Sequence, residues 1–119
     1  MNDFYSDTKT KPSRAMLEYA LGRDFGDEQQ DEDPTTLELC ERVANLLGKE
    51  SAVFLPSGTM CNEIAIKVQT SPGDEIICGS SSHIINFEGG APAAMSGVMI
   101  HPLDGKYGQF TEEDVRQAL

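Results

Sequence analysis

The fold class follows from residues 51–69, SAVFLPSGTMCNEIAIKVQ. Residues 51–55 form a short, continuous apolar run that Pro56 closes, which is typical of a strand buried on both faces of a parallel sheet. The small polar turn 57–59 follows at once, and apolar residues then recur at helical spacing up to about residue 69. The segment therefore predicts a strand, a tight turn and a helix, which is the first part of a βαβ unit.

The same alternation continues on both sides of this segment. We predict strands at 75–78 and 98–100, helices at 13–21, 34–47, 83–88 and 111–119, and a helical stretch of small residues at 91–96. Alternating strands and helices favour an α/β fold with a mostly parallel sheet and flanking helices. Because the carboxyl ends of parallel strands share one edge, where ligands bind, we expect residues 57–59 and 80–83 to lie close together.

Composition narrows the class of protein. Among 119 residues, 20 acidic side chains outweigh 9 basic ones, for a formal net charge of −11, which disfavours nucleic acid and anionic membranes as partners. A chain of this length is expected to bury a real core. Its first residues lack a secretion signal, and its three cysteines form no CxxC pair, so we expect a cytoplasmic protein with reduced thiols and no metal site.

Two segments carry candidate chemistry. Ser57, Gly58 and Thr59 offer hydroxyls, a small turn and free N–H groups at a helix start, as a bound phosphate requires, although helix capping alone accounts for the same residues. His83 follows a strand and a run of serines, where it could lie over a ligand ring or act as an acid–base group, or could simply be a capping or half-buried histidine. The acidic run 24–33 lacks EF-hand spacing and predicts a solvated loop.

A family resemblance rests on several motifs in a fixed order. The chain resembles the amino-terminal part of threonine aldolases, in the wider group of pyridoxal-phosphate-dependent β-eliminating lyases and aldolases. The motifs are SDTKTKP at 6–12, GDE at 26–28 with EDPT at 32–35, LGKE at 47–50, FLPSGTMCN at 54–62, PGDEIIC at 72–78 and HIINFEGG at 83–90.

This resemblance implies an architecture. It implies part of the large domain of an aspartate-aminotransferase-like, fold type I enzyme that works as a homodimer or homotetramer. Residues 1–33 would be an irregular segment with a short helix and an acidic loop, and residues 34–119 the first portion of the pyridoxal-phosphate-binding large domain.

The resemblance also implies roles for individual residues. Ser57, Gly58 and Thr59 match the loop that holds the phosphate of the cofactor, pyridoxal 5'-phosphate. His83 matches the catalytic histidine that stacks on the cofactor ring, and Ser6 a residue that helps to hold the substrate carboxylate. The reaction implied is cleavage of a small β-hydroxy-α-amino acid, such as threonine, to glycine and an aldehyde.

The chain also departs from the family pattern. Gln30-Asp31 stands where many relatives have an aromatic residue and glycine, and Phe87 where some have tyrosine. No lysine here matches the Schiff-base lysine, which the family places further downstream, so we expect a truncated enzyme portion that is inactive alone and leaves a half-built sheet. The alternatives are a related β-eliminating amino-acid lyase and a non-catalytic α/β remnant that binds a phosphorylated ligand.

Overall fold

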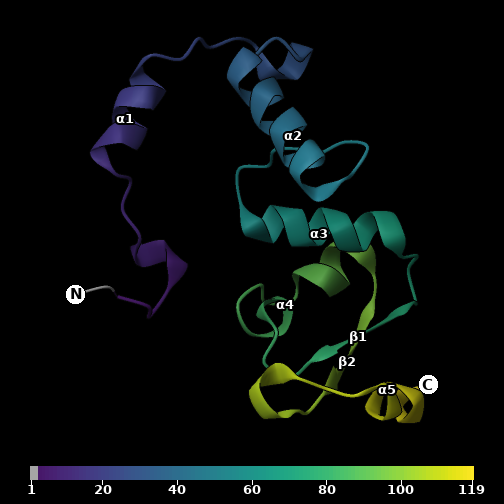
Figure 1. Cartoon of the computed structure of the whole chain (residues 1–119). Coiled ribbons are helices and arrows are strands. Elements are labelled where there is room, and N and C mark those ends of the chain that lie inside the picture. Colours follow the sequence, from purple (N-terminus) through teal and green to yellow (C-terminus); the bar gives the residue numbers. More distant parts are fainter. Residues whose placement is uncertain (1–2) are drawn as a thin grey trace. The chain divides into compact units, whose positions relative to one another are not determined.

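A computed structural model describes residues 3–119 and divides the chain into two compact units, with the boundary between Phe54 and Leu55. The helices and strands, labelled in Figure 1, are α1 (Arg14–Leu21), α2 (Pro34–Leu47), α3 (Gly58–Gln69), β1 (Glu75–Gly79), α4 (His83–Asn86), β2 (Met99–Leu103) and α5 (Glu112–Ala118). Single turns of 3-10 helix at Asp7–Lys9, Glu28–Gln30 and Lys106–Gly108 and a π-helical turn at Pro92–Ser96 complete the order.

The first unit contains two capped helices, and both confirm the sequence prediction. Ser13 accepts a hydrogen bond from the Met16 N–H at 3.2 Å and begins α1. Asp33 accepts one from the Thr36 N–H at 2.7 Å and begins α2, with proline at the first helical position. Gly48, at φ 63°, ends α2 in the left-handed conformation that favours glycine.

The second unit is built around two parallel strands. Ile76 of β1 lies opposite Ile100 of β2, and the chain between the strands runs through α4 and the π-helical turn. Helix α3 packs on that turn, and α5 contacts β2 (Figure 1). A reciprocal capping box between Thr111 and Asp114 begins α5, as the sequence predicts.

The predicted strand at 51–55 does not form. The described sheet consists of β1 and β2 alone, and residues 51–55 have no regular secondary structure. An apolar run becomes a strand only when a neighbour accepts and donates its backbone hydrogen bonds, and neither described strand does so. The α/β class and the parallel pairing are therefore confirmed on a small scale, with a two-stranded sheet in place of the larger one expected.

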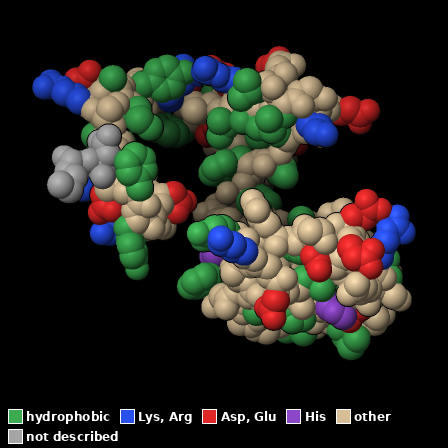
Figure 2. All heavy atoms as spheres, turned by 60° about the horizontal axis from the view of Figure 1, so that its bottom comes forward, with side chains coloured by type: hydrophobic (Ala, Val, Ile, Leu, Met, Phe, Trp, Pro, Cys, Tyr) green, Lys and Arg blue, Asp and Glu red, His purple; other side chains and the backbone are tan. Residues whose placement is uncertain are grey.

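The observed core is also smaller than the sequence predicts. Among the described residues, Ala44 is the one buried residue of the first unit, while Glu88, Pro92, Ser96 and Val98 are buried in the second. Apolar side chains remain on the surface (Figure 2), and Leu47, the last residue of α2, is 64% exposed. An amphipathic stripe buries itself only where another element covers it, and the described elements cover little of these faces.

The length and hydropathy of the described helices bear on a membrane-spanning role. Across residues 3–119, none combines the length and the apolar character needed to traverse a bilayer.

The cap of α2 gives a pH-dependent prediction. Hydrogen bonds from the Thr36 and Gly26 N–H groups lower the pKa of Asp33, so its capping contribution is complete above the ordinary aspartate pKa and is lost as the pH falls through the lowered one. We expect the amide protection factor of Thr36 to fall several-fold at low pH, and to be low at every pH in Asp33→Ala. Asp33→Asn, which caps without titrating, should show little pH dependence. Equal protection in Asp33→Ala and the unchanged chain would contradict this role.

Candidate functional site

The first turn of α3 presents free backbone donors. Ser57 is the N-cap, and its hydroxyl accepts the Met60 N–H at 3.2 Å while its carbonyl accepts the Cys61 N–H at 3.1 Å. Within residues 3–119, the N–H groups of Gly58 and Thr59 have no hydrogen-bond acceptor. These donors lie at the positive end of a twelve-residue helix, which is the arrangement that binds a phosphate group.

The space in front of this turn is open. A Cβ atom placed on Gly58 would meet no atom within 4 Å, and Ser57, Gly58 and Thr59 are all exposed. An anion could therefore approach the backbone without displacing protein atoms. This turn fits the phosphate of the cofactor named above in both donor chemistry and room.

His83 is the first residue of α4 and presents its ring to solvent. Its side chain is 59% exposed. The ring centroid lies 5.1 Å from that of Phe87, with the two planes tilted by 34°. A planar imidazole with one exposed side can lie against a ligand ring or exchange a proton with it.

Glu88 joins His83 to α3. One oxygen of its carboxylate, Oε1, lies 2.7 Å from His83 Nδ1 and accepts the Asn62 side-chain N–H at 2.6 Å. The Glu88 side chain is 0% exposed. The Asn62 hydrogen bond, helped by the one from His83, holds the pKa of Glu88 below its usual range against the opposing effect of burial.

Glu63 lies beside this group on α3. Burial raises the pKa of its carboxyl, and hydrogen bonding with Glu88 and the negative charge of Glu88 raise it further. The site therefore contains two acids whose environments shift their pKa values in opposite directions. Because the acids interact, the titration of each depends on the charge of the other.

The structure connects two of the predicted segments. Asn62 lies one helical turn after Thr59, so the Asn62–Glu88–His83 hydrogen bonds tie His83 to the first turns of α3, within the second unit. Ser6 belongs to the first unit, where it begins the turn Asp7–Lys9 and bonds Thr8.

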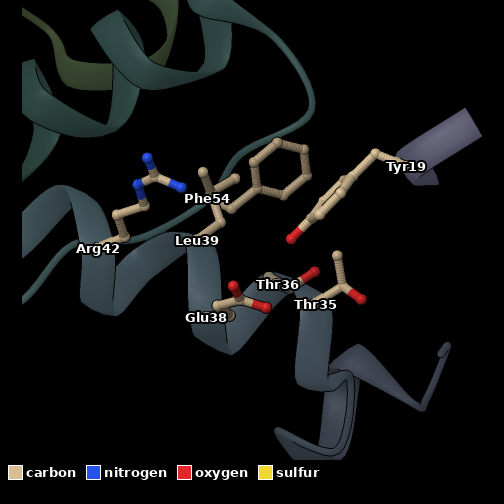
Figure 3. Close-up of a pocket in the computed structure, with 7 residues that line it drawn as sticks. All are labelled: Tyr19, Thr35, Thr36, Glu38, Leu39, Arg42 and Phe54. Atoms are coloured by element: carbon tan, nitrogen blue, oxygen red, sulfur yellow. The ribbon is translucent and has the colours of Figure 1, made fainter. Parts of the chain in front are cut away.

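A separate cavity of about 340 Å³ lies in the first unit. Figure 3 shows the Tyr19 ring of α1 and the Phe54 ring in the upper part of the view, with Thr35, Thr36 and Glu38 of α2 below them. None of the predicted site residues lines it. Its lining residues are Tyr19, Thr35, Thr36, Glu38, Leu39, Arg42 and Phe54.

Comparison with known proteins establishes the family. A family model described as "Beta-eliminating lyase" matches residues 3–119. The chain belongs to this family. It is 41% identical over 104 residues to the "Low specificity L-threonine aldolase" of Escherichia coli (strain K12), covering 87% of this chain and 31% of that protein.

Fungal relatives give a similar result. The "Low-specificity L-threonine aldolase" of Candida albicans is 39% identical over 117 residues, with 96% of this chain and 31% of that protein covered. The "Aldolase vrtJ" of Penicillium aethiopicum is 37% identical over 117 residues, with 95% and 30% covered. The resemblance to threonine aldolases is confirmed, and the chain spans about a third of the length of these curated relatives.

Sequence reasoning missed three residues of the site: Asn62, Glu63 and Glu88. Asn62 and Glu88 lie inside the family motifs, but the motifs alone indicate no role for either. A charged residue beside two glycines predicts a solvent-exposed loop position, and only the folded chain shows that Glu88 is buried. An available signal was the pair Asn62-Glu63 one turn into the helix that begins at the candidate phosphate turn.

The Asn62 hydrogen bond should contribute to stability. In Asn62→Ala, the buried Glu88 carboxylate loses its amide donor, and we expect the free energy of unfolding to fall by about 1.5–3 kcal/mol, the range for hydrogen bonds to charged groups. Urea denaturation near neutral pH measures the difference. Asn45→Ala, at an exposed position of α2, is the matched control and should change stability little. A loss no larger than that of the control would show that Glu88 does not depend on Asn62.

Proposed function

We propose that this chain forms the coenzyme-phosphate side of the active site in a carbon–carbon lyase of threonine aldolase type. The reaction is cleavage of a β-hydroxy-α-amino acid to glycine and an aldehyde. The observation that carries the proposal is the link between the open first turn of α3 and the exposed ring of His83 through Glu88. The printed names of the relatives support the substrate class.

Each residue has a distinct task in this proposal. Pyridoxal 5'-phosphate, when bound, supplies a conjugated ring that accepts the electron pair of the broken Cα–Cβ bond. The N–H groups of Gly58 and Thr59 and the hydroxyls of Ser57 and Thr59 bind its phosphate. His83 covers one face of the ring and moves a proton at Nε2, the nitrogen that Glu88 leaves free. Ser6 binds the substrate carboxylate.

The wider setting is part of the same proposal. We infer the large domain of a fold type I enzyme, with residues 34–119 as the portion that binds the cofactor, and a homodimeric or homotetrameric assembly. Exposed apolar side chains such as Leu46, 80% exposed, support an assembly because a partner surface would cover them. A cytoplasmic location stays a prediction, supported by the three unpaired thiols.

A substitution at Gly58 tests the phosphate turn. Gly58→Val adds a side chain into open space, so the chain should fold normally while the N–H groups of the turn become less accessible. We expect the affinity for pyridoxal 5'-phosphate in the full-length protein to fall about tenfold or more, measured by absorbance titration. Gly22→Val, where a Cβ makes ordinary contacts, is the control. Unchanged affinity in Gly58→Val would remove the turn from the site.

A substitution at His83 tests the role in proton transfer. We expect His83→Ala to lower the rate of threonine cleavage by roughly 100-fold to 10,000-fold, the range of a general acid–base group, with little change in the free energy of unfolding. The aldehyde released is measured directly. An unaffected rate would exclude His83 from the mechanism.

The family description also supports a second candidate, an elimination of β-substituted amino acids. The two reactions give different products, since elimination releases ammonia and a keto acid in place of glycine and an aldehyde. Product analysis with threonine and with a β-substituted amino acid therefore distinguishes them.

A further inference from the structure

Two buried acids lie behind His83 without a cation to balance them. Of their four carboxyl oxygens, only Glu88 Oε1 has a donor among the described residues, while Glu88 Oε2 and both oxygens of Glu63 are buried without one. No lysine or arginine within residues 3–119 forms an ion pair with either acid. Lys67, one turn beyond Glu63 on α3, instead donates to the Met95 carbonyl at 3.0 Å.

Such a pair is stable only if it holds a proton. Two ionised carboxylates buried side by side would repel each other and leave three oxygens without donors. One proton between them removes one charge and supplies one hydrogen bond. Glu88 accepts the Asn62 N–H group, which stabilises its ionised form, whereas neither oxygen of Glu63 has a donor, so the proton belongs on Glu63.

The charge on Glu88 fixes the tautomer of His83. Because Oε1 belongs to an ionised carboxylate that already accepts the Asn62 N–H, the Nδ1 atom of His83 must carry the hydrogen in their 2.7 Å contact. This holds for the neutral and the protonated ring alike. In the neutral ring, Nε2 is then the basic nitrogen.

We propose that Glu63 and Glu88 are positioning residues that act as one unit: protonated Glu63 donates to Glu88, and ionised Glu88 holds His83 with Nδ1–H inward and Nε2 free. The hydrogen bonds of Glu88 with Asn62 and His83 support the Glu88 part, and the buried, unpartnered oxygens of Glu63 support the part of Glu63. The importance of this tautomer for catalysis rests on the proposed function, since only a ligand on the exposed side of the ring would exchange a proton with Nε2.

The tautomer of His83 can be measured without any cofactor. The chain contains two histidines, so ¹⁵N labelling of histidine gives two ring systems, and His101, with Nδ1 3.5 Å from Glu75, is the internal reference. In the full chain, at a pH where the ring is neutral, we expect the Nδ1 signal of His83 to be that of a protonated nitrogen and the Nε2 signal that of an unprotonated one. The reverse pattern would overturn the proposal, and this measurement requires no variant.

Paired substitutions to glutamine and leucine distinguish the effect of a lost hydrogen bond from the effect of a changed side-chain shape. Glu63→Gln keeps a donor toward Glu88 and should preserve the Nδ1–H tautomer of His83. Glu63→Leu removes the donor and should shift the tautomer population of His83 toward Nε2–H. Glu88→Leu removes the acceptor and should make Nε2–H the major form, while Glu88→Gln keeps an acceptor oxygen and should restore Nδ1–H. Glu41→Gln, an exposed position of α2, is the control.

The outcomes distinguish this inference from the proposed function. A His83 pattern that is the same in Glu88→Leu, or altered equally in Glu63→Gln and Glu63→Leu, would overturn the inference. If cofactor affinity responds to Gly58→Val while His83 carries its hydrogen on Nε2, the proposed function stands and the inference fails. If the tautomer is as expected but no cofactor binds, the paired acids stand and the proposed function fails.

Discussion

The buried carboxylate of Glu88 is the constraint on which the site depends. An ionised group with no exposed surface is tolerated only when donors replace its water, and here Asn62 and His83 are those donors. Helix α4 has four residues and is too short to hold its own position. The Glu88 hydrogen bonds therefore fix His83 relative to the start of α3, because both donors must reach the same oxygen.

Local signals made much of the secondary structure predictable. Caps and breakers near Ser13, Asp33 and Thr111 act within one turn of chain, so the helices they begin follow from sequence alone. The run 51–55 has the composition of a strand, but a strand requires a neighbour that the described sheet does not provide. The limit is physical, since capping is satisfied within a segment and strand pairing is not.

The residues of the site also differ in whether their role is visible in the sequence or arises only in the folded chain. Residues 57–59 and His83 were predictable because free N–H groups and an imidazole show their chemistry in the sequence. Glu63 and Glu88 were not, because a carboxyl group signals an exposed position until the fold buries it and supplies its donors. Their environments move the two pKa values in opposite directions, a difference that exists only in the folded chain.

The shared proton also bears on how a chain of net charge −11 could hold an anion. Carboxylates at long range are screened by salt, but Glu63 lies on α3 and Glu88 is hydrogen-bonded to it, and their buried oxygens are weakly screened. A phosphate at residues 57–59 would be repelled by each ionised carboxyl group near the first turns of that helix. With Glu63 protonated, one of the two charges is absent, and the remaining one on Glu88 is offset by hydrogen bonds from Asn62 and His83. On our proposal, the arrangement that orients the imidazole thus also weakens the repulsion that the bound phosphate would meet.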